Sequence, residues 1–199
     1  ADTHATVLHA AASKVDREQR AIWLDGTRLR WPDAPADTRI VLTSSAKAAI
    51  VATPGQPLAG ADTATPLVPA TTPLDPAVAP RFAWFGDGAE FTVPTDAHAT
   101  FVERARGQLV LVAEDADGRV LAATGIQHAA ALDARHAGAA LRAPLGAAVG
   151  QDRARYAVWA PTAHAVALCL YPDATQPATS VHAAARDAES GVWQRDLPG

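Results

Sequence analysis

The side chains best suited to ligand chemistry in this sequence are its tryptophans, because an exposed indole ring can stack on the flat face of a sugar. Trp23 and Trp31 alternate with polar residues, and Trp84 lies in a later apolar run. These three are the candidate carbohydrate-binding residues. The alternative is that they belong to a hydrophobic core, the commoner place for a strand tryptophan in a sandwich fold. Trp159 and Trp193 lie inside other strand-like runs, where a core position is favoured in the same way.

No set of residues matches a catalytic or metal-binding motif. The nucleophile elbow G-x-S-x-G and the phosphate loop G-x-x-x-x-G-K-[ST] are absent, and the seven histidines show no metal-ligand spacing. Residues 114–118 (E-D-A-D-G) contain part of a calcium-loop pattern without its other ligands, so they predict an acidic hairpin turn. Cys169 lies in an apolar run, where a thiol usually behaves as a small hydrophobic side chain. We therefore assign no catalytic residue and no metal ligand.

The composition argues against several classes of protein. Among 199 residues, 17 Lys and Arg stand against 21 Asp and Glu, a formal net charge of -4. Nucleic-acid binding needs a basic surface that neutralises phosphates, so no nucleic-acid partner is expected. No apolar run approaches the roughly 20 residues that cross a bilayer, so no membrane partner is expected. The single cysteine excludes a disulfide within the chain.

Short apolar runs separated by Gly, Pro and Asp predict a chain made mainly of β-strands. The clearest pair is residues 21–24 and 27–31, which Asp25-Gly26 joins. This dipeptide is typical of a two-residue hairpin turn, in which both central residues adopt positive φ. Further strands are expected at residues 38–44, 48–52, 81–85, 90–93, 108–114 and 119–124, of which the first two would pair with each other.

Three segments of this first region differ in composition. Residues 53–80 hold seven of the chain's 15 prolines, so they are expected to form an extended surface loop that cannot sustain a β-ladder. Residues 125–140 are expected to be a connector with a helical turn near Leu132. Residues 5–20 are alanine-rich, which leaves a helix and a loose tail as alternatives.

A second set of strand-like runs follows, at residues 155–159, 166–171 and 192–193. Many short strands with little amphipathic helix favour β-sandwiches over alternating strands and helices. The expected fold is all-β: a tail at 1–15, then tandem immunoglobulin-like β-sandwiches at 16–140 and 143–199. The second has only about 55 residues against the roughly 100 of such a fold, so it is expected to be incomplete.

The second region carries a specific motif. Residues 156–168 read Y-A-V-W-A-P-T-A-H-A-V-A-L. They resemble the strand–turn–strand signature F-x-[LV]-W-A-P-T-A-x-x-V-x-L, which opens the family 48 carbohydrate-binding module of amylolytic enzymes in glycoside hydrolase family 13. The motif alone indicates only this broad family.

The first region narrows the resemblance. Residues 20–25 and 29–32 are similar to the A-x-W-[VL]-D…W-P start of the domain that precedes this module in pullulanase-type debranching enzymes. The later segments R-G-Q-L, D-x-D-G, A-T-G-[IV]-Q and L-D of that domain have counterparts at residues 106–109, 115–118, 123–127 and 132–133. In this order and spacing, the segments indicate the pullulanase type.

The resemblance implies the non-catalytic N-terminal fragment of an enzyme that hydrolyses α-1,6-glucosidic links in pullulan, amylopectin and limit dextrin. In that family an Asp nucleophile, a Glu general acid and a second Asp act in a (β/α)8 barrel. No position of this sequence matches the barrel, so no catalytic residue is carried over and the chain alone is not expected to be active. The implied partners are an α-glucan, through the parent enzyme, and the barrel of the same polypeptide. No cofactor is implied for this chain, and calcium stays open for the parent enzyme.

Two other functions stay open: a stand-alone α-glucan-binding module and an immunoglobulin-like scaffold protein. An incomplete sandwich would expose strand edges and the apolar side chains of Val158, Val166 and Leu168, which favours a dimer through these edges or local disorder. The loop at 172–180 contains no aromatic residue that could contact a sugar. An Ala- and Arg-rich, Lys-poor composition indicates a bacterial protein and leaves a cytoplasmic and an exported location open.

Overall fold

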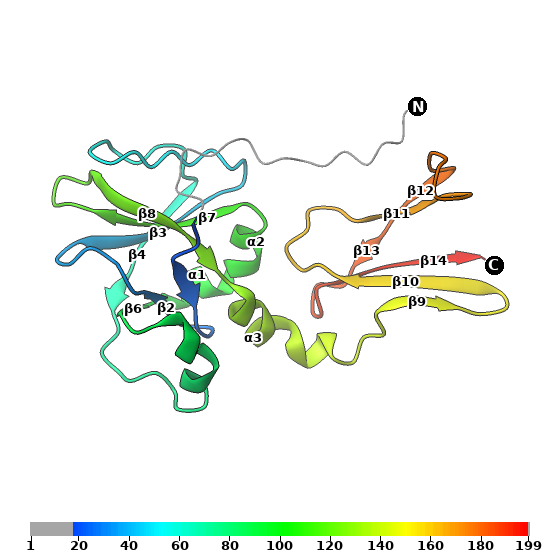
Figure 1. Ribbon diagram of the computed structural model, residues 1–199, viewed down its shortest axis with the longest axis horizontal. Helices are drawn as coiled ribbons and strands as arrows, with labels where there is room; N and C mark the ends of the chain where they lie inside the picture. The colour runs from blue at the N-terminus through cyan, green and yellow to red at the C-terminus, as the bar shows by residue number, and fades with distance from the viewer. Residues whose placement is uncertain (1–17, 199) are drawn as a thin grey trace. The chain divides into compact units, whose positions relative to one another are not determined.

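A computed structural model describes residues 18–198, which fall into an N-terminal unit (18–135) and a C-terminal unit (136–198). The tail expected at 1–15, and most of the helix considered for 5–20, lie outside the described residues. Figure 1 follows the chain by colour from residue 18 onward. Within residues 18–198, no helix is long and apolar enough to cross a membrane.

The N-terminal unit contains eight strands that hydrogen-bond in the order β4-β3-β7-β8-β1-β2-β6-β5. The strands are β1 (Ala21–Trp23), β2 (Arg28–Trp31), β3 (Arg39–Ser45), β4 (Thr63–Pro66), β5 (Val68–Pro69), β6 (Ala89–Thr92), β7 (Gln108–Glu114) and β8 (Val120–Gln127). The helices are the 3-10 helix η1 (Ala79–Phe85) and the α-helices α1 (Thr95–Ala99), α2 (Phe101–Ala105) and α3 (Ala129–Ala140), of which α3 continues past residue 135 into the C-terminal unit.

The eight strands form two layers, and strand pairing connects the layers at both sides. β8 pairs with β7 through residues 120–125 and then with β1 through residues 126–127, so it passes from one layer to the other. On the opposite side, only Leu67 separates β4 from β5, yet β4 pairs with β3 and β5 with β6. Leu67 is buried and donates its N–H to the carbonyl oxygen of Ile40 at 2.8 Å. The result is a β-sandwich with a short proline-containing strand at each end of the strand order.

Large apolar side chains fill the space between the layers. Trp23 lies opposite Leu29, and Leu29 opposite Phe91, which places all three on one face of their layer. The ring of Trp23 lies 4.4 Å from that of Phe101 in α2, a helix that contacts β3 and β7 of the other layer. Phe101 therefore joins the apolar faces of the two layers.

The outer faces are covered by the segments between strands. Over β7 and β8 the buried apolar cluster comprises Ile50, Ala52, Val110, Val112, Val120 and Ala123, with Leu58 and Ala61 packed against it. Over β1, Ile22 and Leu24 pack with Phe82 of η1 and Ala130 of α3. This second contact fixes η1 on the sandwich, and η1 carries Trp84.

Most expected strands of this unit are confirmed, but the first turn differs from expectation. Neither Asp25 nor Gly26 has positive φ, and residues 24–27 separate the two strands. The Asp25 carboxylate accepts the N–H of Thr27 at 2.6 Å and its hydroxyl at 3.0 Å. The aspartate side chain therefore closes the turn, which needs no left-handed residue.

Four other expectations need correction. Residues 48–52 form no strand, because Ala48 has a φ of 52° and Val51 makes only an isolated bridge. The proline-rich segment 53–80 does contain β-ladders, β4 and β5, since an edge strand tolerates proline. Residues 81–85 belong to the helix η1, which has proline in its first turn. Residues 125–140 contain the helical turn expected near Leu132, as part of the longer helix α3, but their first residues complete β8 and are not a connector.

The C-terminal unit consists of a four-stranded sheet, in the order β13-β14-β10-β9, and the β11–β12 hairpin. The strands are β9 (Gly146–Val149), β10 (Arg153–Trp159), β11 (Ala167–Leu170), β12 (Ser180–Ala183), β13 (Ala185–Arg186) and β14 (Val192–Pro198). The strands expected in this unit are confirmed, and β9, β12 and β13 are additional. The hairpin has two strands and the sheet has four, as expected for an incomplete sandwich. The all-β class is confirmed.

Candidate carbohydrate-binding site

The three candidate tryptophans lie in different environments. Trp23 and Trp31 have exposed fractions of 1% and 0%, and the indole nitrogen of each is also buried. A ring without a free face cannot stack on a sugar, so both are core residues and are corrected as binding candidates. Trp84 is 67% exposed and is the tryptophan whose ring is open to a ligand.

The exposed ring of Trp84 is held by contacts within η1. Its Nε1 donates a hydrogen bond to the carbonyl oxygen of Arg81 at 3.0 Å. The ring of Phe85 lies 5.5 Å away and almost perpendicular, at 87°. Because the polar N–H is already bonded within the helix, the surface that Trp84 presents to solvent is mainly apolar.

The helix that carries Trp84 is anchored at both ends. Pro80 lies in its first turn, and Phe82 is buried against the strand β1 and the helix α3. Gly86 closes the helix with a φ of 80°, a left-handed value that favours glycine. The guanidinium of Arg30 donates to the carbonyl oxygen of Gly86 at 2.9 Å, which fixes the end of the helix to β2.

Arg30 is itself part of a partly buried cluster with Arg28 and Glu90. The Glu90 carboxylate accepts hydrogen bonds from Arg28 at 2.9 Å and from Arg30 at 2.6 Å. Burial raises the pKa of Glu90, but the hydrogen bonds and positive charges of the two arginines outweigh this effect and hold the pKa below its ordinary value. Glu90 is therefore ionised at neutral pH and supports the scaffold beneath Trp84.

Arg81, in the same helix as the aromatic pair, forms an ion pair with a residue of α3. A guanidinium nitrogen of Arg81 lies 3.7 Å from a carboxylate oxygen of Asp133 in α3, and both side chains are more than half exposed. The Arg81 guanidinium is also 5.7 Å from the centre of the Phe82 ring. We define Arg81, Trp84, Phe85 and Asp133 as the Trp84 platform.

Sequence reasoning identified Trp84 but missed the other members of the platform. The adjacent aromatic residues Trp84 and Phe85, close after Pro80, were a usable signal, since two successive aromatics cannot both point inward from one strand. Asp133 had no such signal as a member of this platform, because it lies 48 positions after Phe85 in the sequence. Only the packing of α3 on η1 brings it there.

Trp159 and Trp193 have structural positions in the C-terminal unit. Nε1 of Trp159 donates to the carbonyl oxygen of Ser190, and Nε1 of Trp193 to that of Ala160, both at 2.9 Å. The two indoles thus tie together the ends of β10 and β14. Next to this corner, Nδ1 of the buried His136 donates to the carbonyl oxygen of Glu189 at 2.8 Å.

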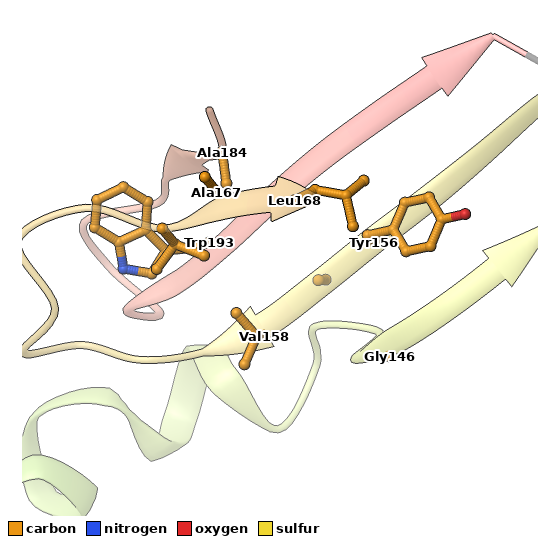
Figure 2. Close-up of a pocket in the computed structure, with 9 residues that line it drawn as sticks. Gly146, Tyr156, Val158, Ala167, Leu168, Ala184 and Trp193 are labelled. Carbon is orange, nitrogen blue, oxygen red and sulfur yellow. The ribbon is translucent and has the colours of Figure 1, made fainter. Parts of the chain in front are cut away.

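The C-terminal unit also has an apolar groove of about 210 Å³ between its sheet and its hairpin (Figure 2). Its larger lining side chains are Tyr156, Val158, Leu168 and Trp193. Figure 2 shows the Tyr156 hydroxyl pointing away from Trp193, at the far end of the groove. A sugar site needs several convergent polar groups, so the groove is better suited to an apolar protein surface than to a glucan.

The remaining sequence features have structural explanations. The carboxylate of Asp115 accepts the N–H groups of Asp117 and Arg119, which makes residues 114–118 a hairpin turn. Cys169 is half-buried in β11. Among residues 18–198, no three His, Cys, Asp or Glu side chains are grouped so that they could hold a metal ion. Tyr171, just before the loop at 172–180, is 51% exposed; the sequence placed it at the end of an expected strand and not among the binding candidates.

Comparison with known proteins covers both units. Residues 18–134 match the family model of the pullulanase N2 domain, and residues 144–199 match that of carbohydrate-binding module 48, the isoamylase N-terminal domain. The pullulanase of Klebsiella pneumoniae is 31% identical over 192 residues, which is 96% of this chain and 17% of that protein. Pullulanase 1 of Arabidopsis thaliana, a chloroplastic protein, is 29% identical over 116 residues, 58% of this chain and 11% of that protein.

Solved structures agree with this result. The crystal structure of Klebsiella pneumoniae pullulanase complexed with maltotriose matches with a TM-score of 0.78 and 30% identity, over 94% of this chain and 17% of that chain. The apo form from the same organism matches with a TM-score of 0.77 and 29% identity, over 92% of this chain and 19% of that chain. This sequence thus spans less than a fifth of the length of these relatives. It belongs to the pullulanase family, with an N2 domain followed by carbohydrate-binding module 48 sequence.

Proposed function

We propose that this chain is a non-catalytic, glucan-engaging part of a debranching enzyme that hydrolyses α-1,6-glucosidic links in pullulan, amylopectin and limit dextrin. The observation that supports this most is the similarity to Klebsiella pullulanase, which extends through both units in the same order. One of the similar structures is that protein complexed with maltotriose. We place the N2 sandwich at 16–140 and the module from 143 onward. A catalytic barrel in the same polypeptide is the partner that this proposal implies.

Glu90 and Glu114 are carboxylates in structural surroundings. Hydrolysis needs two carboxyl groups held open to the sugar, one as acid and one as base or nucleophile. The partly buried Glu90 and the buried Glu114 are instead ion-paired, Glu90 with Arg28 and Arg30, and Glu114 with Arg39 at 3.3 Å. Their environments are those of structural ion pairs.

The proposal predicts glucan binding without hydrolysis. In native gels cast with pullulan, we expect the purified chain to migrate more slowly than in gels without polysaccharide, relative to a non-binding marker protein. We expect no reducing ends after incubation with pullulan. Release of reducing ends would overturn the non-catalytic assignment, and unchanged mobility would overturn the glucan-engaging one.

A second role is favoured by the open groove of the C-terminal unit. Val158, in the groove, is 47% exposed, and the edge strand β9 is exposed at all four positions and carries no charge or proline. Such edges and faces pair readily with another chain. We propose that the isolated chain dimerises through this unit.

The dimer predicts a mass that depends on concentration. By light scattering after size exclusion, we expect the mass to rise from 20.6 kDa towards twice that value as the protein is concentrated. Val158→Lys should keep the chain monomeric. Val181→Lys is the matched control and should not change the mass. Val181 is 50% exposed and pairs with Cys169, so it lies on the other face of the hairpin from Leu168, which lines the groove. A chain that stays monomeric at all concentrations contradicts the proposal.

A further inference from the structure

We propose that the Trp84 platform of the N-terminal unit is a binding site for one glucose unit of an α-glucan, in which the sugar stacks on Trp84 and bonds Arg81 and Asp133. The inference rests on the proposed function and names a site for it.

The ring is open and already oriented. Two-thirds of the Trp84 surface is exposed, although tryptophan is a residue that proteins normally bury to a large extent. The hydrogen bond from its Nε1 to Arg81 and the perpendicular contact with Phe85 restrict its rotamers before any ligand arrives. Binding therefore costs little side-chain entropy, which is the advantage of a preorganised site.

The support beneath the ring is stiff. Phe82, two residues before Trp84, is buried in the apolar cluster with Ile22 and Leu24. Gly86, two residues after it, is bonded to Arg30, and Arg30 is bonded to Glu90. An exposed residue on a flexible loop would have neither anchor. This exposed tryptophan is instead attached to the core of the sandwich on both sides.

The two charges of the platform cancel, which favours a neutral ligand, and one of them belongs to Arg81, the residue whose carbonyl oxygen bonds the Trp84 indole. Arg81 and Asp133 carry opposite charges, and their 3.7 Å separation with exposed side chains makes a weak ion pair that hydroxyl groups can replace. Guanidinium and carboxylate groups bond pairs of adjacent hydroxyls in a bidentate manner. An anion would be repelled by Asp133. A glucose unit instead has an apolar C–H face for the indole and hydroxyls at its edge for the two charges.

The test compares variants of the whole chain in pullulan gels at graded polysaccharide concentrations, with and without competing maltotriose. We expect Trp84→Ala to raise the dissociation constant about tenfold, as removal of a central aromatic anchor does. Trp84→Phe should keep part of the retardation, because it keeps a ring. Tyr171→Ala is the control: Tyr171 is also a half-exposed aromatic, in the C-terminal unit, and its loss should leave retardation unchanged.

The outcomes separate this site from the proposed function. Retardation of the unmodified chain that Trp84→Ala weakens about tenfold or more, and that Tyr171→Ala leaves unchanged, would support the site. Equal retardation of the unmodified chain and Trp84→Ala would overturn the site, and the chain would still engage glucan elsewhere. Loss in Tyr171→Ala alone would overturn it in favour of the C-terminal unit. If the unmodified chain is not retarded, the proposed glucan-engaging function fails as well. Circular dichroism of each variant shows that the fold is retained.

Discussion

Replacing Trp23 with alanine is expected to lower the free energy of unfolding of the N-terminal unit by about 3–5 kcal/mol. The indole is 1% exposed and lies 4.4 Å from Phe101, the residue that joins the two apolar faces of the sandwich. Alanine would leave a cavity that the strands cannot fill, since β1 is paired on both sides, with β2 and β8. Urea denaturation followed by circular dichroism measures the change.

Two further variants show whether burial causes this effect. Trp23→Phe keeps most of the ring volume and removes an indole N–H that has no hydrogen-bond partner, so we expect a loss below about 1.5 kcal/mol. Trp84→Ala makes the same chemical change at the exposed ring and should change stability by no more than about 0.5 kcal/mol. A similar loss in Trp23→Ala and Trp84→Ala would mean that the core is not where we place it.

The second large effect is expected at Glu90. Glu90→Ala would leave Arg28 and Arg30, which are 11% and 10% exposed, as partly buried charges without their carboxylate, at a cost of about 3 kcal/mol. Glu90→Gln keeps an acceptor oxygen and should cost less. Glu103→Gln is the control, because the Glu103 side chain is 66% exposed in its ion pair with Arg106 and the change should cost about 0.5 kcal/mol or less. Equal losses in the two Gln variants would contradict a special role for Glu90.

The same carboxylate gives stability a defined pH dependence. In the folded protein the pKa of Glu90 lies below its ordinary value of 4.5. The folded state therefore holds this proton less strongly than the unfolded state does. Its stabilising contribution is complete above about pH 5 and is lost as the pH falls through the lowered folded pKa. Acid titrations of unfolding should therefore show the unmodified chain approaching Glu90→Gln in stability below pH 4.5. A stability difference that stays constant down to pH 3 would contradict this.

The strands of the sandwiches were predictable where one pattern dominated. Arg39–Ser45 and Gln108–Glu114 are long β-branched or apolar runs bounded by turn residues, and both form strands close to the expected bounds. The segment 81–85 misled because Phe82 and Trp84 alternate as in a strand, whereas proline in the first turn and the packing of Phe82 on α3 favour a helix. The pairing of the edge strands β4 and β5 depends on distant partners, which no local pattern in a proline-rich segment reveals.

The candidate site was predictable only in part for the same reason. An indole shows its chemistry in the sequence but not its exposure, so Trp23, Trp31 and Trp84 looked alike. They differ in exposure because Trp23 and Trp31 lie in strands of the sandwich and are buried, whereas Trp84 lies in the helix η1 and is exposed. Asp133 joins Arg81 only through tertiary packing. The motif at residues 156–168 and the segments of the first region, by contrast, together identified the family from the sequence alone, because they need no knowledge of exposure.

The pairing of β1 with β8 also affects how the chain folds while it is being synthesised. The backbone N–H of Arg20 bonds the hydroxyl of Thr124, a residue that is 104 positions later in the chain. At about 5–20 residues per second, a ribosome needs roughly 5–20 s to add those residues. During that interval the first strand has been made but its parallel neighbour has not, and Trp23 has no completed sandwich to enter. Nascent chains of this protein are therefore most open to chaperones and proteases before residue 127 has left the ribosome.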